Sequence, residues 1–460
     1  MAKPSSPRSA RFALALLACA GAGACANANE DGVALSKATA LEIPKVPVPS
    51  EHGPKLASVA DLTPVLDRPG AGAKRLGYLH AGSRVPRAEQ PYSREGCAEG
   101  WFPVRPAGFV CAGGSATLDL KHPTLAAMAI QPLFDQPLPY TYARATSDTP
   151  LYERRSGQDG SVQEIGKLKR KAGMAVVGSW SAQIPGGGSE RLALLTSGRF
   201  VKASDLEAAD PSDFTGVEVD GKDDFPVAFV VKRGVRSWKL DGEDAKVGDD
   251  LAVHQKLELT GRFRSAHGER FWALEKDRWV RNKDVTVVQA RNTFPDFAIE
   301  GQKWLDVSVV MGTVVAYEGK RPFFVTLLSV GRTPESAKPA EPPAAENGEV
   351  PVITAPSAAW GLGTFEVRAK HVTLVGADPF AAREAYQLYD LPWAVELSSG
   401  RLGYAAYWHD RFGVEHGPGA LELAPADAVR LWQWITPSVP DGWHGREGGS
   451  EPKTLVVLRK

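Results

Sequence analysis

The sequence predicts a mainly β protein made of several small β-barrel modules followed by a larger β-rich domain. Its 460 residues include 46 Gly and 35 Pro, an excess over average usage that favours many turns. Short apolar segments bounded by Gly, Asp and Pro recur along the chain and are typical of short strands. A chain of this length predicts more than one core, because domains usually hold about 100–200 residues.

Composition excludes two classes of protein. Lys plus Arg and Asp plus Glu are equal at 54 each, so the formal net charge is zero, which argues against a nucleic-acid-binding protein. A hydrophobic content of 43%, with 12 Trp and 17 Phe, supplies enough apolar surface for real cores and excludes a wholly disordered chain.

The N-terminus predicts export. Lys3, Arg8 and Arg11 precede an apolar run that begins at Phe12 and gives way to small residues, the layout of a signal peptide over residues 1–25. No later stretch reaches the ~18 apolar residues of a membrane-spanning helix. Both Cys25 and Cys19 follow sequences that resemble a bacterial lipobox, so a lipid anchor at either residue is one prediction and simple cleavage to a soluble exported protein is the other.

The two remaining cysteines predict a disulfide. Cys97 and Cys111 lie fourteen residues apart across an apparent hairpin, with no nearby His or further Cys that would favour a metal site. Closing a loop of this length is worth about 3 kcal/mol in the chain-entropy account.

A weak internal repeat follows a polar, Pro-bearing tether over residues 26–56. Copies open at Thr63, Thr149 and Val235, each 86 residues after the one before. Each copy continues with a turn, an apolar strand ending in Gly and an aromatic–Val step, as at Phe109-Val110. The repeat predicts three barrel modules over residues 57–120, 140–208 and 226–288. Their pattern resembles bacterial Src-homology-3-like modules, which implies either ligand binding or a spacer role.

The region 295–460 contains the predicted β-rich domain. A strand is expected at 303–309, a hairpin over 312–331 turning at Tyr317–Pro322, a solvated Pro/Ala/Glu-rich loop over 332–357, and further strands ending with one at 453–460. The segment ADAVRLWQW predicts a short helix near the C-terminus, which begins near Pro425 and Asp427 and packs Leu431 and Trp434 into the core.

In order, these segments resemble the catalytic domain of the L,D-transpeptidase (YkuD-type) family. The resemblance is carried by the WLDVSV strand, AYEGKRPFFVTLLSVG, Leu391-Pro392-Trp393, YWHDRFG and LAPADA. It implies a β-rich fold that acts on peptidoglycan stem peptides. In that family a His-Gly-Cys-x-Asn turn supplies a thiolate that attacks the donor peptide, and His assists the proton transfer.

This sequence departs from the family's catalytic motif. Alignment on LAPADA places Ala420 at the nucleophile, Pro418 at the nearby His and Glu422 at the Asn, while Gly419 is retained. Alignment on the WHD segment places Tyr404 at the upstream His. No cysteine occurs after Cys111, so no other register restores the thiol.

Five residues around this motif form the predicted cleft: Trp408, His409, Asp410, His416 and Gly419. We expect His409 to make a hydrogen bond that shapes the pocket wall, His416 to be an exposed loop residue, and Asp410 and Glu422 to be charges on a solvated turn. The nine histidines show no pair at metal spacing, so neither a metal nor a cofactor is expected.

The predicted function is therefore that of a cell-envelope pseudoenzyme, which binds or scaffolds peptidoglycan and is inactive as an acyltransferase. One alternative is an active L,D-transpeptidase with altered catalytic residues. The other is an interaction protein that works through its barrel modules. Expected partners are stem peptides or cell-wall proteins in the periplasm or cell envelope, with membrane contact only through a lipid anchor and no nucleic acid.

Overall fold

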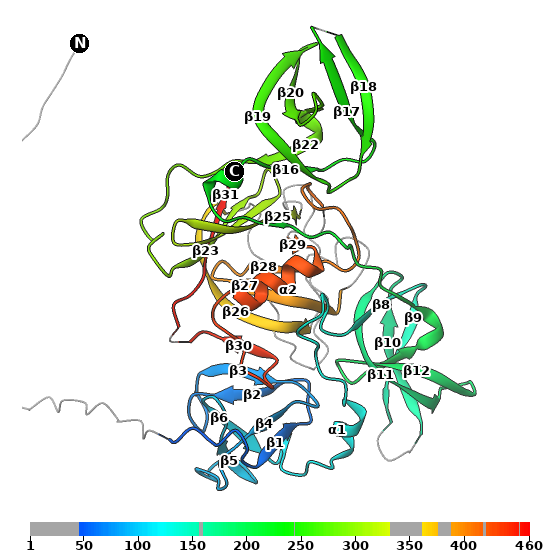
Figure 1. Cartoon of the computed structure of the whole chain (residues 1–460). Helices are drawn as coiled ribbons and strands as arrows, with labels where there is room; N and C mark the ends of the chain where they lie inside the picture. The colour runs from blue at the N-terminus through cyan, green and yellow to red at the C-terminus, as the bar shows by residue number, and fades with distance from the viewer. Residues whose placement is uncertain are drawn as a thin grey trace, which may run out of the picture. The chain divides into compact units, whose positions relative to one another are not determined.

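The computed structural model describes residues 46–155, 160–242, 244–331, 361–375, 388–416, 420–449 and 451–460 (Figure 1). The predicted signal peptide with Cys19 and Cys25, the tether before residue 46 and the loop 332–357 therefore lie outside the described residues. Among the residues described, no helix combines the length and apolarity needed to cross a membrane.

The first module contains seven short strands. These are β1 (Lys55–Ser58), β2 (Thr63–Leu66), β3 (Arg75–Leu79), β4 (Arg84–Pro86), β5 (Gly100–Pro103), β6 (Phe109–Ala112) and β7 (Ala116–Thr117). Strand β1 pairs with β4 and β7, β2 pairs with β3 and β6, and β5 pairs with β6. The first strand begins at Lys55, inside the stretch expected to be tether. A short helix, α1 (Pro123–Ala127), follows the module.

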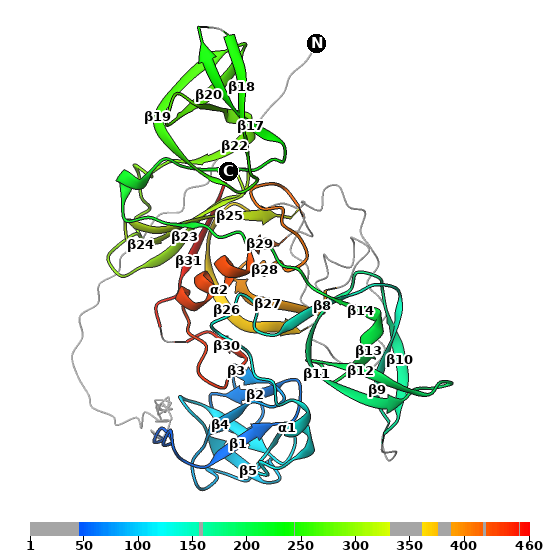
Figure 2. The same ribbon diagram turned by 45° about the vertical axis from the view of Figure 1, so that its right-hand side comes forward.

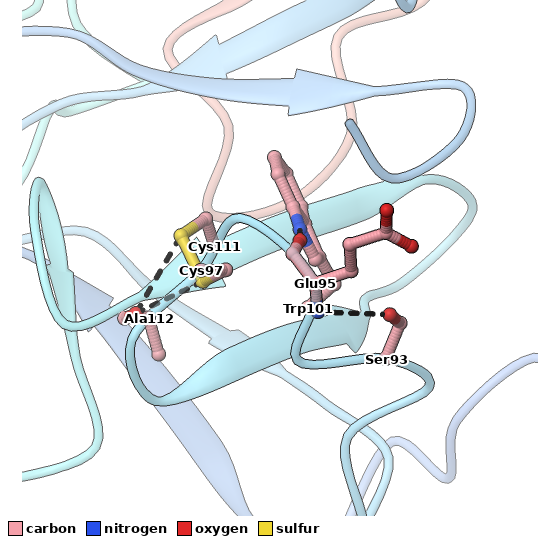
Figure 3. Close-up of a disulfide and its surroundings, with 6 residues drawn as sticks. All are labelled: Ser93, Glu95, Cys97, Trp101, Cys111 and Ala112. Atoms are coloured by element: carbon pink, nitrogen blue, oxygen red, sulfur yellow. Dashed lines mark hydrogen bonds between the residues drawn. A yellow bond between two sulfur atoms is a disulfide. The ribbon is translucent and has the colours of Figure 1, made fainter. Parts of the chain in front are cut away.

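The disulfide lies in this module (Figure 3). Cys97 and Cys111 are joined by an S–S bond, and their sulfur atoms lie 3.1 and 3.5 Å from the carbonyl oxygen of Ala112. Beside it, the Trp101 indole donates to the Glu95 carbonyl at 2.9 Å. The covalent link holds the segment between β4 and β5 against β6, and the hydrogen bond holds it against β5.

The second and third modules share one strand order. The second contains β8 (Thr141–Ala145), β9 (Thr149–Arg154), β10 (Val162–Leu168), β11 (Gly173–Gln183), β12 (Ser189–Leu195), β13 (Phe200–Lys202), η1 (Ala203–Asp205) and β14 (Leu206–Ala208). The third contains β16 (Val227–Val230), β17 (Val235–Asp241), β18 (Asp244–Leu251), β19 (Lys256–Ala266), β20 (Glu269–Leu274), β21 (Trp279–Arg281), η3 (Asn282–Asp284) and β22 (Val285–Val288). The orders β10-β9-β13-β12-β11-β8-β14 and β18-β17-β21-β20-β19-β16-β22 correspond strand for strand. Figure 2 shows both modules from a second direction.

This correspondence has a local cause. In each of the three modules the strand that opens a copy pairs with the strand after the turn and with the strand that holds the aromatic–Val step. The residues that repeat at 86-residue intervals are therefore those that pair at the same place in each sheet.

The C-terminal domain is a closed ring of eight strands. They are β23 (Lys303–Ser308), β24 (Thr313–Glu318), β25 (Arg321–Val330), β29 (Leu421–Leu423), β28 (Leu402–Ala405), β27 (Asp390–Leu397), β26 (Gly363–Val375) and β31 (Leu455–Arg459), in pairing order, and β31 returns to β23. Two short strands add to it, since β15 (Val217–Glu218) pairs with β25 and β30 (Gly445–Glu447) pairs with β26. The 3-10 turn η2 (Lys222–Asp224) follows β15.

Helix α2 (Pro425–Trp434) covers the strands β27 and β28 (Figure 1). Its buried residues include Leu431 and Trp432, at 1% and 4% exposure, and Trp434 is partly buried against the same apolar cluster. The expected packing of Leu431 and Trp434 toward the core is therefore found, with Trp434 at the edge of the cluster, and Trp432 adds to it by contacting Trp393. Asp427 in its first turn accepts hydrogen bonds from Thr215 and from the Gly216 N–H, which fastens the segment before β15 to the domain.

Candidate functional site

Tyr404 and Glu422, which the sequence alignment places at the family's upstream His and at its Asn, lie on two adjacent parallel strands, β28 and β29. Their register pairs Tyr404 with Glu422 and Gly403 with Leu421. Because directly paired residues of neighbouring strands point to the same face of a sheet, Tyr404 and Glu422 are side by side. The Tyr404 hydroxyl donates to Glu422 Oε1 at 3.4 Å.

Glu422 is buried and paired with His409. Its Oε2 lies 2.7 Å from His409 Nε2, and the two side chains are 0% and 7% exposed. The expectation that Glu422 is a charge on a solvated turn is therefore wrong, since the residue lies in strand β29 inside the domain. The expected hydrogen bond of His409 is present, and this carboxylate is the group that it engages.

Both ring nitrogens of His409 are occupied. Nδ1 accepts a hydrogen bond from the Arg411 backbone N–H at 3.0 Å, which leaves Nε2 as the protonated nitrogen that donates to Glu422. Burial lowers the pKa of the His409 imidazole to about 4, an effect that Asp410 opposes and Arg411 reinforces. With both nitrogens engaged, this imidazole has no lone pair available to take a proton from a nucleophile.

Ala420, which the sequence alignment places at the family's nucleophile, is 2% exposed. It belongs to an apolar cluster that also contains Tyr404, Tyr407 and Leu402. Its carbonyl accepts from the Gly331 N–H at 3.1 Å, which joins the start of β29 to the end of β25. Pro418 and Gly419, which precede it, lie outside the described residues.

The other predicted cleft residues are partly brought together. The His416 and His409 rings are perpendicular at 4.6 Å between centroids, and the Trp408 ring lies 5.8 Å from that of His409. His416 is half-buried rather than exposed, and its carbonyl accepts from Ser329 Oγ at 2.7 Å. These three aromatic rings form one continuous group beside Glu422.

Asp410 faces a pocket of about 260 Å³. It forms an ion pair with Arg233 at 2.6 Å, in which the two side chains are 46% and 79% exposed. The lining combines residues of the C-terminal domain and the third module: Asp410, Arg411, Phe412, Val414, Val231, Arg233, Val253 and His254. Sequence reasoning missed the contribution of the third module because nothing local to residues 231–254 indicates what they contact.

Within the described part of the chain, no group of three or more His, Cys, Asp or Glu side chains is placed to hold a metal ion. The described residues of the site supply a buried carboxylate–imidazole pair, a buried methyl group and a pocket that carries charges of both signs.

No family model and no curated protein matches the sequence. Among solved structures the chain is similar to L,D-transpeptidases from Xylanimonas cellulosilytica, Stackebrandtia nassauensis and Mycobacterium smegmatis, at 14%, 15% and 15% identity. These matches cover 37%, 37% and 55% of this chain and 64%, 62% and 99% of the other chains, with TM-scores of 0.22, 0.21 and 0.23. The chain thus spans less than two thirds of the length of the first two, and such low scores assign neither family nor activity.

Proposed function

We propose that this chain is an exported cell-envelope protein that binds peptidoglycan through its C-terminal domain without cross-linking it. The observation that carries the proposal is that the residue aligned with the family's nucleophilic Cys is an alanine, Ala420, which is only 2% exposed. A methyl group has no lone pair with which to attack a peptide carbonyl, so a covalent acyl intermediate cannot form there.

The neighbouring groups do not replace the thiol. Glu422 is fully buried and hydrogen-bonded to His409, and both nitrogens of that imidazole are engaged. Activating an alternative nucleophile would require a free basic nitrogen within hydrogen-bond reach of it. The buried pair therefore supports a structural role, in which the carboxylate anchors the segment of His409 to β29.

Binding is supported by the pocket beside Asp410. Stem peptides carry carboxylates and amines, and the pocket lining contains both cations, Arg233 and Arg411, and an anion, Asp410. A guanidinium can bind a carboxylate through two parallel hydrogen bonds, which gives orientation as well as attraction.

Export is supported by the basic and then apolar pattern of residues 1–25 and by the disulfide, because such bonds persist in oxidising compartments. The repeat pattern that resembles Src-homology-3-like modules is a further reason to place the chain at the cell wall.

The first test combines sacculus pelleting with a covalent probe. The purified chain should co-sediment with sacculi, form no new stem-peptide bridges, and show no mass increase after incubation with a carbapenem. A covalent carbapenem adduct on the C-terminal domain would overturn the proposal in favour of an active transpeptidase.

Variants locate the binding site. Arg411→Ala should weaken sedimentation severalfold because it removes a cation from the pocket, whereas Lys121→Ala, an exposed cation of the segment after the first module, should not. Equal sedimentation of both variants and the unaltered chain would assign binding to another surface, with the barrel modules as the leading alternative.

The same site predicts the outcome of restoring the thiol. Ala420→Cys should remain inactive and react slowly with a disulfide reagent such as DTNB, since position 420 is buried and His409 is held by Glu422. Rapid thiol modification or recovered cross-linking would show that the position is open to substrate.

A further inference from the structure

Three buried histidines meet where the first module joins the C-terminal domain. His80 follows β3, His371 lies on β26, and His444 precedes β30, with exposures of 2%, 5% and 1%. The rings of His80 and His444 are stacked at 4.5 Å between centroids, and the Tyr78 hydroxyl lies 3.0 Å from His371 Nδ1. Tyr140 completes the group, with its ring 6.1 Å from that of His444. We call His80, His371 and His444 the histidine cluster.

Each imidazole of the histidine cluster has one nitrogen without a partner. Nδ1 of His80 contacts the Ala81 carbonyl, that of His371 contacts Tyr78, and His444 hydrogen-bonds the backbone of Thr373. Within the described residues, the Nε2 atoms of all three have no hydrogen-bond partner. A neutral imidazole tolerates this, because a bare Nε2 is only an unused acceptor in the Nδ1–H tautomer. At His371 and His444 an imidazolium adds a buried N–H donor and a positive charge with nothing to receive either, which is costly. At His80 the Thr196 backbone offsets part of that cost, but no carboxylate of the described ranges balances the charge.

The surroundings of the cluster do not compensate a positive charge. Arg75 on β3 and Arg368 on β26 are cations that disfavour protonation of His371. The carboxylates of Glu447 on β30 and Glu396 on β27 are bound to these two arginines. Tyr78 and Tyr140 stay neutral because burial raises their pKa above the ordinary value.

The remaining neighbours of the cluster are also without compensating charge. The second module presents only the Thr196 backbone to His80, while Asp390 on β27 acts on Tyr140 rather than on a histidine. No carboxylate among the described residues acts on any of the three imidazoles.

The cluster lies at the seam that holds the first module in place. Strand β3 pairs with β30, with Gly77 opposite Arg446 and Tyr78 opposite Gly445. Trp443 belongs to the apolar core of the first module, is 1% exposed, and donates from its indole to the Arg105 carbonyl at 2.9 Å. Separation of the module from the domain would bring all three imidazoles into contact with water.

We propose that the histidine cluster is an acid-sensitive latch: neutral imidazoles hold the first module on β30, and protonation of the three rings opens this seam. The burial of the three rings supports this latch. Burial lowers the pKa of His80 to about 4, the pKa of His371 to about 3 and the pKa of His444 well below its ordinary value. In the open state each ring titrates near its usual pKa of about 6.5.

The direction of the effect follows from these values. The closed state binds fewer protons than the open state between pH 6.5 and about 4, so closure is complete above pH 6.5 and weakens as the pH falls. Each histidine reduces the closing equilibrium constant by about tenfold per pH unit below 6.5, so opening takes up about three protons.

Hydrogen exchange of the full chain tests the latch. Protection factors, corrected for the intrinsic pH dependence of exchange, are measured for the amides of β3 and β30 from pH 7.5 to 4.5. We expect protection to fall below pH 6.5 with a slope approaching three protons, and His444→Leu to reduce that slope by about one. His52→Leu, which changes an exposed histidine in the segment just before β1, should leave the slope unchanged.

A slope below two protons, or the same slope in His444→Leu as in the unaltered chain, overturns the proposal. If His444→Leu does not fold, NMR of imidazole-labelled protein decides: neutral rings of His80, His371 and His444 at pH 5.5 support the latch, and normal titration of these three overturns it.

Discussion

At the scale of the residue, buried carboxylates of the C-terminal domain bind donors from distant segments. Glu422 receives His409, Asp427 receives Thr215 and Gly216, and Asp390 receives Thr196 Oγ1 at 2.6 Å and the Ala175 N–H at 2.9 Å. Burying any of these carboxylates without a hydrogen-bond donor would cost free energy. Each carboxylate therefore requires that the chain segment with its donor lies beside it.

Removal of the Glu422 carboxylate should destabilise the chain. In Glu422→Ala the His409 Nε2–H loses its acceptor and a cavity forms, so we expect a loss of at least about 1–3 kcal/mol in the free energy of unfolding. Urea denaturation measures it. Glu422→Gln preserves an acceptor and should lose clearly less; equal losses would show that the hydrogen bond is not the cause.

Because of Asp390, we expect a contribution to folding stability that decreases as the pH rises, opposite in direction to that of the histidines. Burial raises its pKa to about 6, so the folded chain holds this proton more tightly than the unfolded chain does. The resulting stability is complete below the ordinary Asp pKa and is lost as the pH rises through about 6.

Comparison with Asp390→Asn isolates this contribution. Between pH 3.5 and 7 the unaltered chain should lose stability relative to the variant by a free energy on the order of 3 kcal/mol. Thermal unfolding of both chains across this range provides the measurement, and a constant difference between them would mean that Asp390 has the same pKa in the folded and the unfolded chain.

At the scale of the element, strand pairs depend on glycines that permit close approach. A Cβ on Gly445 would lie 2.2 Å from the Tyr78 ring, and one on Gly77 would lie 2.2 Å from the Gly445 carbonyl. The pairing of β3 with β30 therefore requires these two residues to lack side chains.

Gly445→Ala should disrupt that pairing. We expect a lower melting temperature and faster amide exchange in β3, while β27 remains protected. Gly114→Ala is the matched control because its Cβ would meet nothing within 4 Å. Unchanged exchange in β3 would show that the strand pair tolerates the methyl group.

At the scale of the whole molecule, the first module and the C-terminal domain are not independent folding units. Trp443 lies in the same apolar cluster as Leu56, Val65 and Val110 of the first module, although it is far from them in sequence. Burial of a large aromatic side chain of this kind stabilises a core by several kcal/mol.

Trp443→Ala should therefore destabilise the first module as well as the junction. The expected loss is about 3–5 kcal/mol, measured by denaturation and by exchange of the β5 and β6 amides. Phe263→Ala removes an aromatic side chain that is 57% exposed and should change stability little. A similar loss in both variants would contradict the assigned role of Trp443.

Much of the fold could be predicted from local pattern. Alternating apolar residues and turn residues predicted β23, the hairpin β24–β25, β31 and helix α2, because strand and helix periods are properties of neighbouring residues. The candidate site was less accessible, since the burial of Glu422 follows from the parallel pairing of β28 with β29, which no local signal specifies.

By itself, the sequence determined the mainly β character, the 86-residue spacing of the copies and the lack of any cysteine after Cys111. Only the tertiary structure decided that His409 is held by a buried carboxylate, that Trp443 completes the first module, and that Tyr78 meets His371 across 293 residues of chain. The physical reason is that residue types and their spacing act over one element, whereas burial and charge pairing depend on which distant strands come together.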